Sequence, residues 1–163
     1  MWHNVPEVRE ILESLTTEDM MDPLPMEPLA MDSSVEEVIR QMNKTSADLC
    51  CIVDSTGMLA GIITRSDLVR ALEHSQLADP DVDLPVTELM VMNPVSMAIN
   101  EPLTVAVSAM RNRDLKQLPI VDNSKHRRPI GRVCIERIVE YVLLEMTNRK
   151  NRERVATAAG AKN

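Results

Sequence analysis

The stretch "VEEVIRQMNKTSADLCCIVD", residues 35–54, decides the fold because the chain contains a second copy of its pattern. Residues 103–122 read "LTVAVSAMRNRDLKQLPIVD" and align with it without a gap, 68 positions later. In both copies apolar residues recur at spacings of three and four, and an apolar run ending in "IVD" follows. This pattern predicts an amphipathic helix followed by a strand, repeated once.

Each copy continues in the same way, with a turn, a second strand and a second helix. The continuations are "DSTGMLAGIITRSDLVRAL" from residue 54 and "DNSKHRRPIGRVCIERIVEYV" from residue 122. One such unit of roughly 60 residues is too small to bury a good core, so we expect two to pack together. The predicted organisation is an N-terminal helix within residues 1–15, repeat 1 at 16–77, a linker at 78–85, repeat 2 at 86–146, and a basic tail at 147–163 that frays into disorder.

This pattern resembles the CBS-domain pair, or Bateman module, over about residues 16–146. The first copy matches the family's order of strand, D-x-x-G turn, G-h-h-T-x-x-D and helix, whereas the second departs from it at the polar positions. The resemblance implies an α/β (α+β) fold of two tandem CBS repeats. Each would be a small mixed sheet flanked by two helices, and the two would pack as a pseudo-two-fold pair. It also implies a regulatory, often dimeric module that binds adenine nucleotides or related ligands between its repeats.

The polar residues of the first copy suit such a ligand. Asp67 opens a helix, where its carboxylate can accept hydrogen bonds from both hydroxyls of a ribose. Thr64 can donate to a phosphate oxygen beside the N–H groups of the helix start, and Arg65 could add positive charge. The other residues assigned to this site are Ser66 in the same motif and, flanking the base by resemblance, Pro28, Leu29 and Cys51.

The same motif has a purely structural interpretation. Thr64-x-x-Asp67 has the spacing of a capping box, in which the threonine caps the helix and the carboxylate reaches back from the third helical position. Such a cap contributes about 1 kcal/mol and requires no ligand. The two interpretations are compatible, and the sequence leaves both open.

The second copy has Cys134 and Arg137 in place of that threonine and aspartate. A thiol is a weak donor and a guanidinium cannot accept from ribose hydroxyls, so this cleft is not expected to bind a nucleoside in the family's way. Either it is closed by its own side chains, or its cations serve a phosphate held by the first copy. Those cations would be Arg132, Arg137 and the basic hairpin at residues 125–128.

Charge and aromatic content argue against nucleic-acid binding. The net charge is −7, and Trp2 and Tyr141 are the only aromatic residues among the 163. The charge is uneven, because residues 1–37 contain ten acids and one base, whereas residues 125–163 contain ten bases and four acids. This polarity could steer association with a partner, or could simply be a solvated surface.

The sequence also argues against a disulfide, a metal site, a membrane span and a catalytic site. The three cysteines form no CxxC pair, which indicates reduced thiols in a cytoplasmic protein. The three histidines lack metal-ligand spacing, no run of about 18 apolar residues could insert into a membrane, and no catalytic motif is present. We therefore expect neither a metal site nor an enzyme.

Two classes of function remain. The first is a homodimeric ligand-sensing module that binds AMP, ADP, ATP or S-adenosylmethionine and signals to an unidentified regulated protein. The second is a dimerising interaction module that binds no ligand, such as the cytosolic part of an ion channel or transporter. The sequence names neither the ligand nor the partner.

Overall fold

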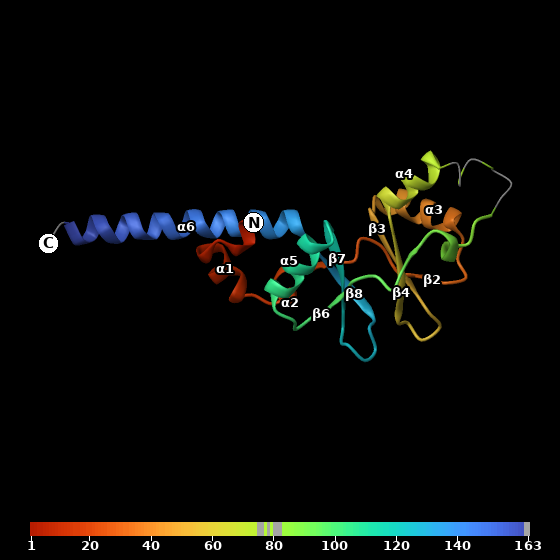
Figure 1. Cartoon of the computed structure of the whole chain (residues 1–163), viewed down its shortest axis with the longest axis horizontal. Coiled ribbons are helices and arrows are strands. Elements are labelled where there is room, and N and C mark those ends of the chain that lie inside the picture. The colour runs from red at the N-terminus through yellow and green to blue at the C-terminus, as the bar shows by residue number, and fades with distance from the viewer. Residues whose placement is uncertain (75–76, 78, 80–82, 162–163) are drawn as a thin grey trace. The chain divides into compact units, whose positions relative to one another are not determined.

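The structure is a computed structural model that describes residues 1–74, 77, 79 and 83–161, so half of the predicted linker at 78–85 lies outside the described residues. The first part of the chain forms η1 (Trp2–Asn4), α1 (Pro6–Glu13), α2 (Thr17–Met20), β1 (Asp22–Pro23), β2 (Leu29–Ala30), α3 (Val35–Thr45), β3 (Leu49–Val53), β4 (Leu59–Thr64) and α4 (Arg65–Glu73) (Figure 1). The second part forms η2 (Val86–Glu88), β5 (Val91–Met92), β6 (Met97–Ala98), α5 (Leu103–Asn112), β7 (Gln117–Val121), β8 (Pro129–Cys134) and α6 (Ile135–Ala161).

Two mixed sheets of four strands carry the internal repeat. Their strand orders are β2-β3-β4-β5 and β1-β8-β7-β6. The parallel pair β2–β3 places Leu29 opposite Ile52, and the parallel pair β6–β7 places Met97 opposite Ile120. Both partners of the second pair follow those of the first by 68 residues, the shift found in the sequence. The predicted fold class, two tandem repeats of mixed sheet and helices, is therefore confirmed.

The segment at the start of each predicted repeat, before its first long helix, pairs with the sheet of the other repeat. β1 pairs with β8 of the second repeat, and β5 pairs with β4 of the first. Backbone bonds continue the exchange: Thr17 N–H donates to the Glu101 carbonyl at 2.9 Å, and Val86 N–H donates to the Ser33 carbonyl at 3.0 Å. The entry of each repeat thus completes the sheet of the other, so the two repeats are tied together by main-chain hydrogen bonds.

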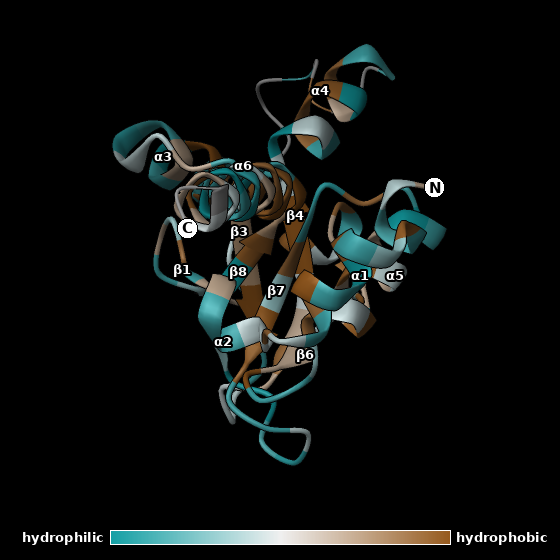
Figure 2. Cartoon of the chain, turned by 90° about the vertical axis from the view of Figure 1, so that its left-hand side faces the viewer, coloured by the Kyte–Doolittle hydropathy of each residue, from teal (hydrophilic) through white to brown (hydrophobic). Residues whose placement is uncertain are grey.

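The core around β3 and β4 is aliphatic and rich in methionine. Because side chains alternate along a strand, β3 contributes to two clusters, one on each face. The cluster that includes α3 contains Met26, Val38, Met42, Ala47, Cys50, Ile52, Ile63, Val86 and Met90. The cluster on the other face joins both sheets and contains Leu49, Cys51, Leu59, Ala98 and Val121. Brown runs along these strands in Figure 2, whereas the helices carry much of the teal.

The described chain divides into two compact units. One, the β3–β4 unit, comprises residues 22–99 and 119–132, and the other, the α6 unit, comprises residues 1–21, 100–118 and 133–163. Within the α6 unit, α1 packs against α5 and α6. Ile11 and Leu12 of α1 are each 1% exposed, so the predicted N-terminal helix is an integral part of a core.

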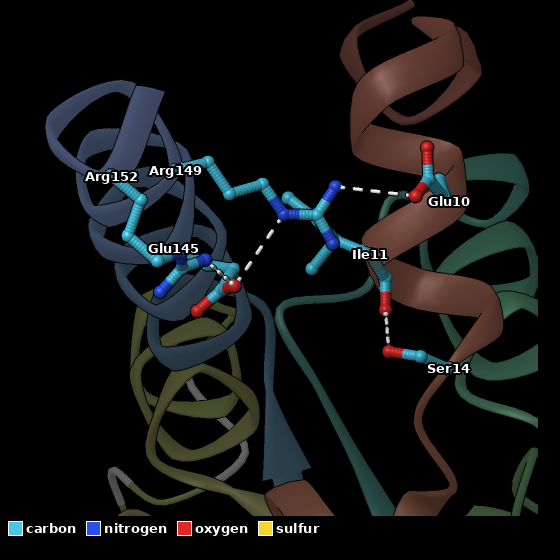
Figure 3. A network of polar contacts seen from close by, with 6 residues as sticks. All are labelled: Glu10, Ile11, Ser14, Glu145, Arg149 and Arg152. Atoms are coloured by element: carbon cyan, nitrogen blue, oxygen red, sulfur yellow. Dashed lines mark hydrogen bonds and ion pairs between the residues drawn. The ribbon is translucent and has the colours of Figure 1, made fainter. Parts of the chain in front are cut away.

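The expectation of a disordered tail from residue 147 does not match the structure, because α6 continues as one helix to Ala161 (Figure 1). Nine of residues 147–161 are Ala, Arg, Lys or Glu, which are strong helix formers, and ion pairs support the helix. Arg149 approaches Glu145 and Glu10 of α1, each at 3.4 Å, and Arg152 approaches Glu145 at 3.1 Å (Figure 3). Residues 150–160 are all exposed, so the end of the helix depends on local interactions alone.

Candidate functional site

Thr64 and Asp67 form the capping box that their spacing predicts. Thr64 is the N-cap of α4, and its backbone N–H donates to Asp67 Oδ2 at 2.8 Å. In return, the Asp67 backbone N–H donates to Thr64 Oγ1 at 3.2 Å. Asp67 is 7% exposed, and its Oδ1 accepts a hydrogen bond from Arg70. The Thr64 hydroxyl still has its own proton to donate, and each carboxylate oxygen can accept a further bond.

Arg65 and Ser66 occupy the first turn of α4 and are both exposed. The Arg65 guanidinium donates to the Ala47 carbonyl at 2.5 Å, and the Arg65 backbone N–H donates to the Asp48 carbonyl at 3.0 Å. The segment that precedes β3 is thereby held against the start of α4. The positive charge of Arg65 lies beside the capping box, but its guanidinium is engaged by a backbone carbonyl.

The three residues expected to flank a base differ in their accessibility. Leu29 lies in β2 opposite Ile52, and Pro28 immediately precedes that strand; both are half-buried. Cys51 is 2% exposed within the cluster that joins the two sheets, and burial raises the pKa of its thiol to about 12. Leu29 and Pro28 therefore have partly open surface, whereas Cys51 would meet a ligand only if that cluster rearranged.

The second repeat keeps the backbone of this site and loses its polar groups. The Ile135 backbone N–H donates to the Lys116 carbonyl at 2.9 Å, which repeats the bond from Arg65 to Asp48. Cys134, at the end of β8, is half-buried, and Arg137 is exposed in the first turn of α6. Arg137 belongs to the α6 unit, not to the unit that holds Thr64 and Asp67.

Asp48 is the residue of this site that sequence reasoning missed. Arg132 of β8 forms an ion pair with the Asp48 side chain, and the two side chains are 20% and 53% exposed. Because the Asp48 carbonyl accepts from Arg65, this pair brings Arg132 to the neighbourhood of the capping box. The available signal was a charge reversal: Lys116 stands 68 residues after Asp48, at the aligned position of the second copy.

The basic hairpin at residues 125–128, one of the alternative sources of charge for a phosphate at Thr64, lies at the other end of β4. The Leu59 backbone N–H donates to the Arg127 carbonyl at 2.9 Å, which places the hairpin beside the β3–β4 turn. Leu59 and Thr64 are the opposite ends of β4, about 16 Å apart at the usual rise of a strand. An arginine at the turn does not span that distance.

Comparison with known proteins identifies the family. The family model described as "CBS domain" matches residues 8–74 and 86–144, which is most of the chain. The chain belongs to the CBS domain family. A CBS domain-containing protein of Dictyostelium discoideum is 28% identical over 120 residues, covering 69% of this CBS pair and 81% of that relative. A homoserine O-acetyltransferase of Methanohalobium evestigatum is 30% identical over 109 residues, and the CBS pair covers only 20% of its length.

Solved structures share the fold of this CBS pair. The CBS domain pair of protein MJ0100, in complex with 5′-methylthioadenosine and S-adenosyl-L-methionine, has a TM-score of 0.63 and 25% identity, and the match covers 78% of this chain and 94% of that one. CBSX2 in complex with AMP has a TM-score of 0.64 at 20% identity, with 80% and 98% of the two chains covered. At that identity the second likeness shows the fold alone.

Two other kinds of feature are absent from the described part of the chain. No group of three or more His, Cys, Asp or Glu side chains there could hold a metal ion. None of the described helices is both long enough and apolar enough to cross a membrane.

Proposed function

We propose that this CBS pair is a cytoplasmic regulatory module that binds an adenosyl ligand at the start of α4 and signals its presence to a partner protein. The candidate ligands are AMP, ADP, ATP and S-adenosylmethionine. The observation that carries the proposal is the capping box of Thr64 and Asp67, which places a hydroxyl donor and a carboxylate acceptor together in a CBS fold. The two adenosyl ligands in the complex of the MJ0100 CBS domain pair support the same ligand class.

The capping box does not compete with this role. A ribose has two vicinal hydroxyls, which can both donate to one carboxylate. Asp67 is held in a single orientation by the Thr64 N–H and by Arg70, so little conformational entropy is lost when a ligand binds. The N–H groups at the start of α4 would add favourable partial charge for an anionic group.

A signal could leave the site through the exchanged strands. β4 ends at Thr64 and is paired along its edge with β5, which belongs to the second repeat in sequence. A ligand that shifts the start of α4 would therefore act on main-chain hydrogen bonds between the repeats. Val69 and Leu72 of α4 are 51% and 62% exposed, which supports the proposal of a homodimer formed through this helix. We further propose that the module does no chemistry itself.

A second function, an interaction module that binds no ligand, is favoured by one observation. Both oxygens of Asp67 already have partners within the protein, so the motif has a structural purpose without any ligand. The two functions predict different results for the same variant, because only a ligand site loses binding when the carboxylate is removed.

The test is a thermal-shift panel on the purified chain with AMP, ADP, ATP and S-adenosylmethionine, each with and without Mg²⁺. A ligand at 100 times its Kd adds about 2.7 kcal/mol to the unfolding free energy, which raises Tm by several degrees. Asp67→Ala should abolish the shift. Asp19→Ala is the matched control, because Thr16 and Asp19 form a second capping box, at α2, that has no assigned ligand. No shift with any compound at millimolar concentration would favour the interaction module.

A further inference from the structure

Asp48 lies directly beside the proposed ligand site. Its carbonyl accepts the backbone N–H of Arg65, the first residue of α4, at 3.0 Å. The next residue, Leu49, is the strand partner of Thr64. The Asp48 side chain is 53% exposed and its carboxylate pairs with Arg132, while its backbone lies next to the start of α4. A ligand held by Thr64 and Asp67 would therefore experience the negative charge of Asp48.

The cations around the start of α4 are already engaged. The Arg65 guanidinium donates to the Ala47 carbonyl, Arg70 pairs with Asp67, and Arg132 pairs with Asp48. Beside the N–H groups at the start of α4, these three arginines are the cations closest to a phosphate bound here. A phosphate that bound Arg132 would remove the counter-charge of the Asp48 carboxylate. The phosphate dianion and the carboxylate are both negative, so they would repel each other.

We propose that Asp48 makes this site select adenosyl compounds that carry no phosphate over adenine nucleotides. The inference rests on the proposed function and narrows its ligand class. An uncharged substituent on the ribose C5′, as in 5′-methylthioadenosine, leaves the Asp48–Arg132 pair intact. The 5′-phosphate of AMP has to break that pair or bind against the carboxylate.

The second copy of the sequence indicates that the carboxylate is not required by the fold. Lys116 occupies the aligned position, and its carbonyl accepts from Ile135 just as that of Asp48 accepts from Arg65. The backbone therefore tolerates either charge at this point. Asp48→Asn keeps the size of the side chain, removes its charge and with it the ion pair to Arg132.

The experiment is isothermal titration of the full chain with 5′-methylthioadenosine and with AMP, at one salt concentration. We expect wild type to bind 5′-methylthioadenosine about tenfold more tightly than AMP. Asp48→Asn should tighten AMP binding about tenfold and change the Kd of 5′-methylthioadenosine by less than about twofold. Asp54→Asn is the control, because it removes the same charge at the far end of β3, about 20 Å away.

The outcomes separate this inference from the function beneath it. If both compounds bind but Asp48→Asn leaves the ratio of their Kd values unchanged, Asp48 does not select against the phosphate. The inference is then wrong, and the proposed function stands. Tighter binding of AMP than of 5′-methylthioadenosine by wild type would also overturn the inference alone. If neither compound binds to wild type or to Asp48→Asn, the inference fails, and the adenosyl-binding function fails with it only if the thermal-shift panel also shows no shift.

Discussion

Gly61 offers the sharpest test of the strand exchange between the repeats. It lies in β4 opposite Met92 of β5, a strand supplied by the second repeat. A Cβ at this position would lie 2.5 Å from Met90 Sδ, 2.9 Å from Met90 Cγ and 3.0 Å from the Val91 carbonyl oxygen. The sulfur belongs to a flexible side chain and can move, but the carbonyl oxygen is part of the exchanged backbone. Gly61→Ala should therefore overpack this junction and lower the unfolding free energy by about 1–3 kcal/mol.

A double-mutant cycle with Met90→Ala isolates the cause. Met90 is 7% exposed, so its truncation alone should cost about 2–5 kcal/mol. Because the truncation removes the sulfur that the new methyl group meets, Gly61→Ala should cost at least about 1 kcal/mol less in that background. Urea unfolding followed by far-UV circular dichroism measures each free energy.

Gly57→Ala serves as the control for this cycle. Gly57 has φ +86°, and an added Cβ would find its nearest neighbour at 3.7 Å, so its cost of about 1 kcal/mol comes from the backbone and should not depend on Met90. Additive effects of Gly61→Ala and Met90→Ala, or a gain in stability from Gly61→Ala alone, would refute the packing of β5 against β4 described above.

Three further predictions follow from burial and hydrogen bonding. Because burial raises the pKa of Cys51 to about 12, an alkylating reagent at pH 8 should modify the half-buried Cys134 well before Cys51. Mass spectrometry after digestion measures the two rates, and equal rates would contradict the burial of Cys51 between the sheets. Deleting residues 150–163 should reduce the helical signal but change the unfolding free energy by less than about 0.5 kcal/mol, since residues 150–160 are all exposed. The side-chain hydrogen bond from Thr56 lowers the pKa of Asp54. The stabilisation by the Asp54 carboxylate is therefore present above the unfolded pKa of about 3.9 and is lost as the pH falls through the folded pKa. Asp54→Ala should flatten the dependence of the unfolding free energy on pH in that acidic range, and an unchanged dependence would count against the turn.

The local part of the candidate site was predictable because it is made by near neighbours in the chain. Thr64 and Asp67 are three residues apart, and the rules for helix N-termini apply to that spacing without knowledge of the rest of the fold. The Asp48–Arg132 pair was not predictable in this way. It joins residues 84 positions apart, and nothing in the periodicity around either residue indicates the other.

The long final helix shows the same division. Its first turns were predictable from apolar spacing, since Ile138 and Val142 are buried at 1% and 3% exposure. Its continuation past residue 147 has no apolar face, so the sequence pattern suggested a frayed end. The structure continues the helix through good helix formers and through the ion pairs of Arg149 with Glu145 and Glu10.

The sequence by itself determined the twofold repeat, the order of helix and strand within it, and the asymmetry between Thr64/Asp67 and Cys134/Arg137. These follow from periodicity and from residue chemistry, which are local properties. Only the tertiary structure decided that each entry segment completes the other repeat's sheet, and that Arg132 lies beside the first repeat's site. The physical reason is that a strand edge offers the same N–H and C=O groups to any partner, so its pairing is chosen by packing across the whole fold.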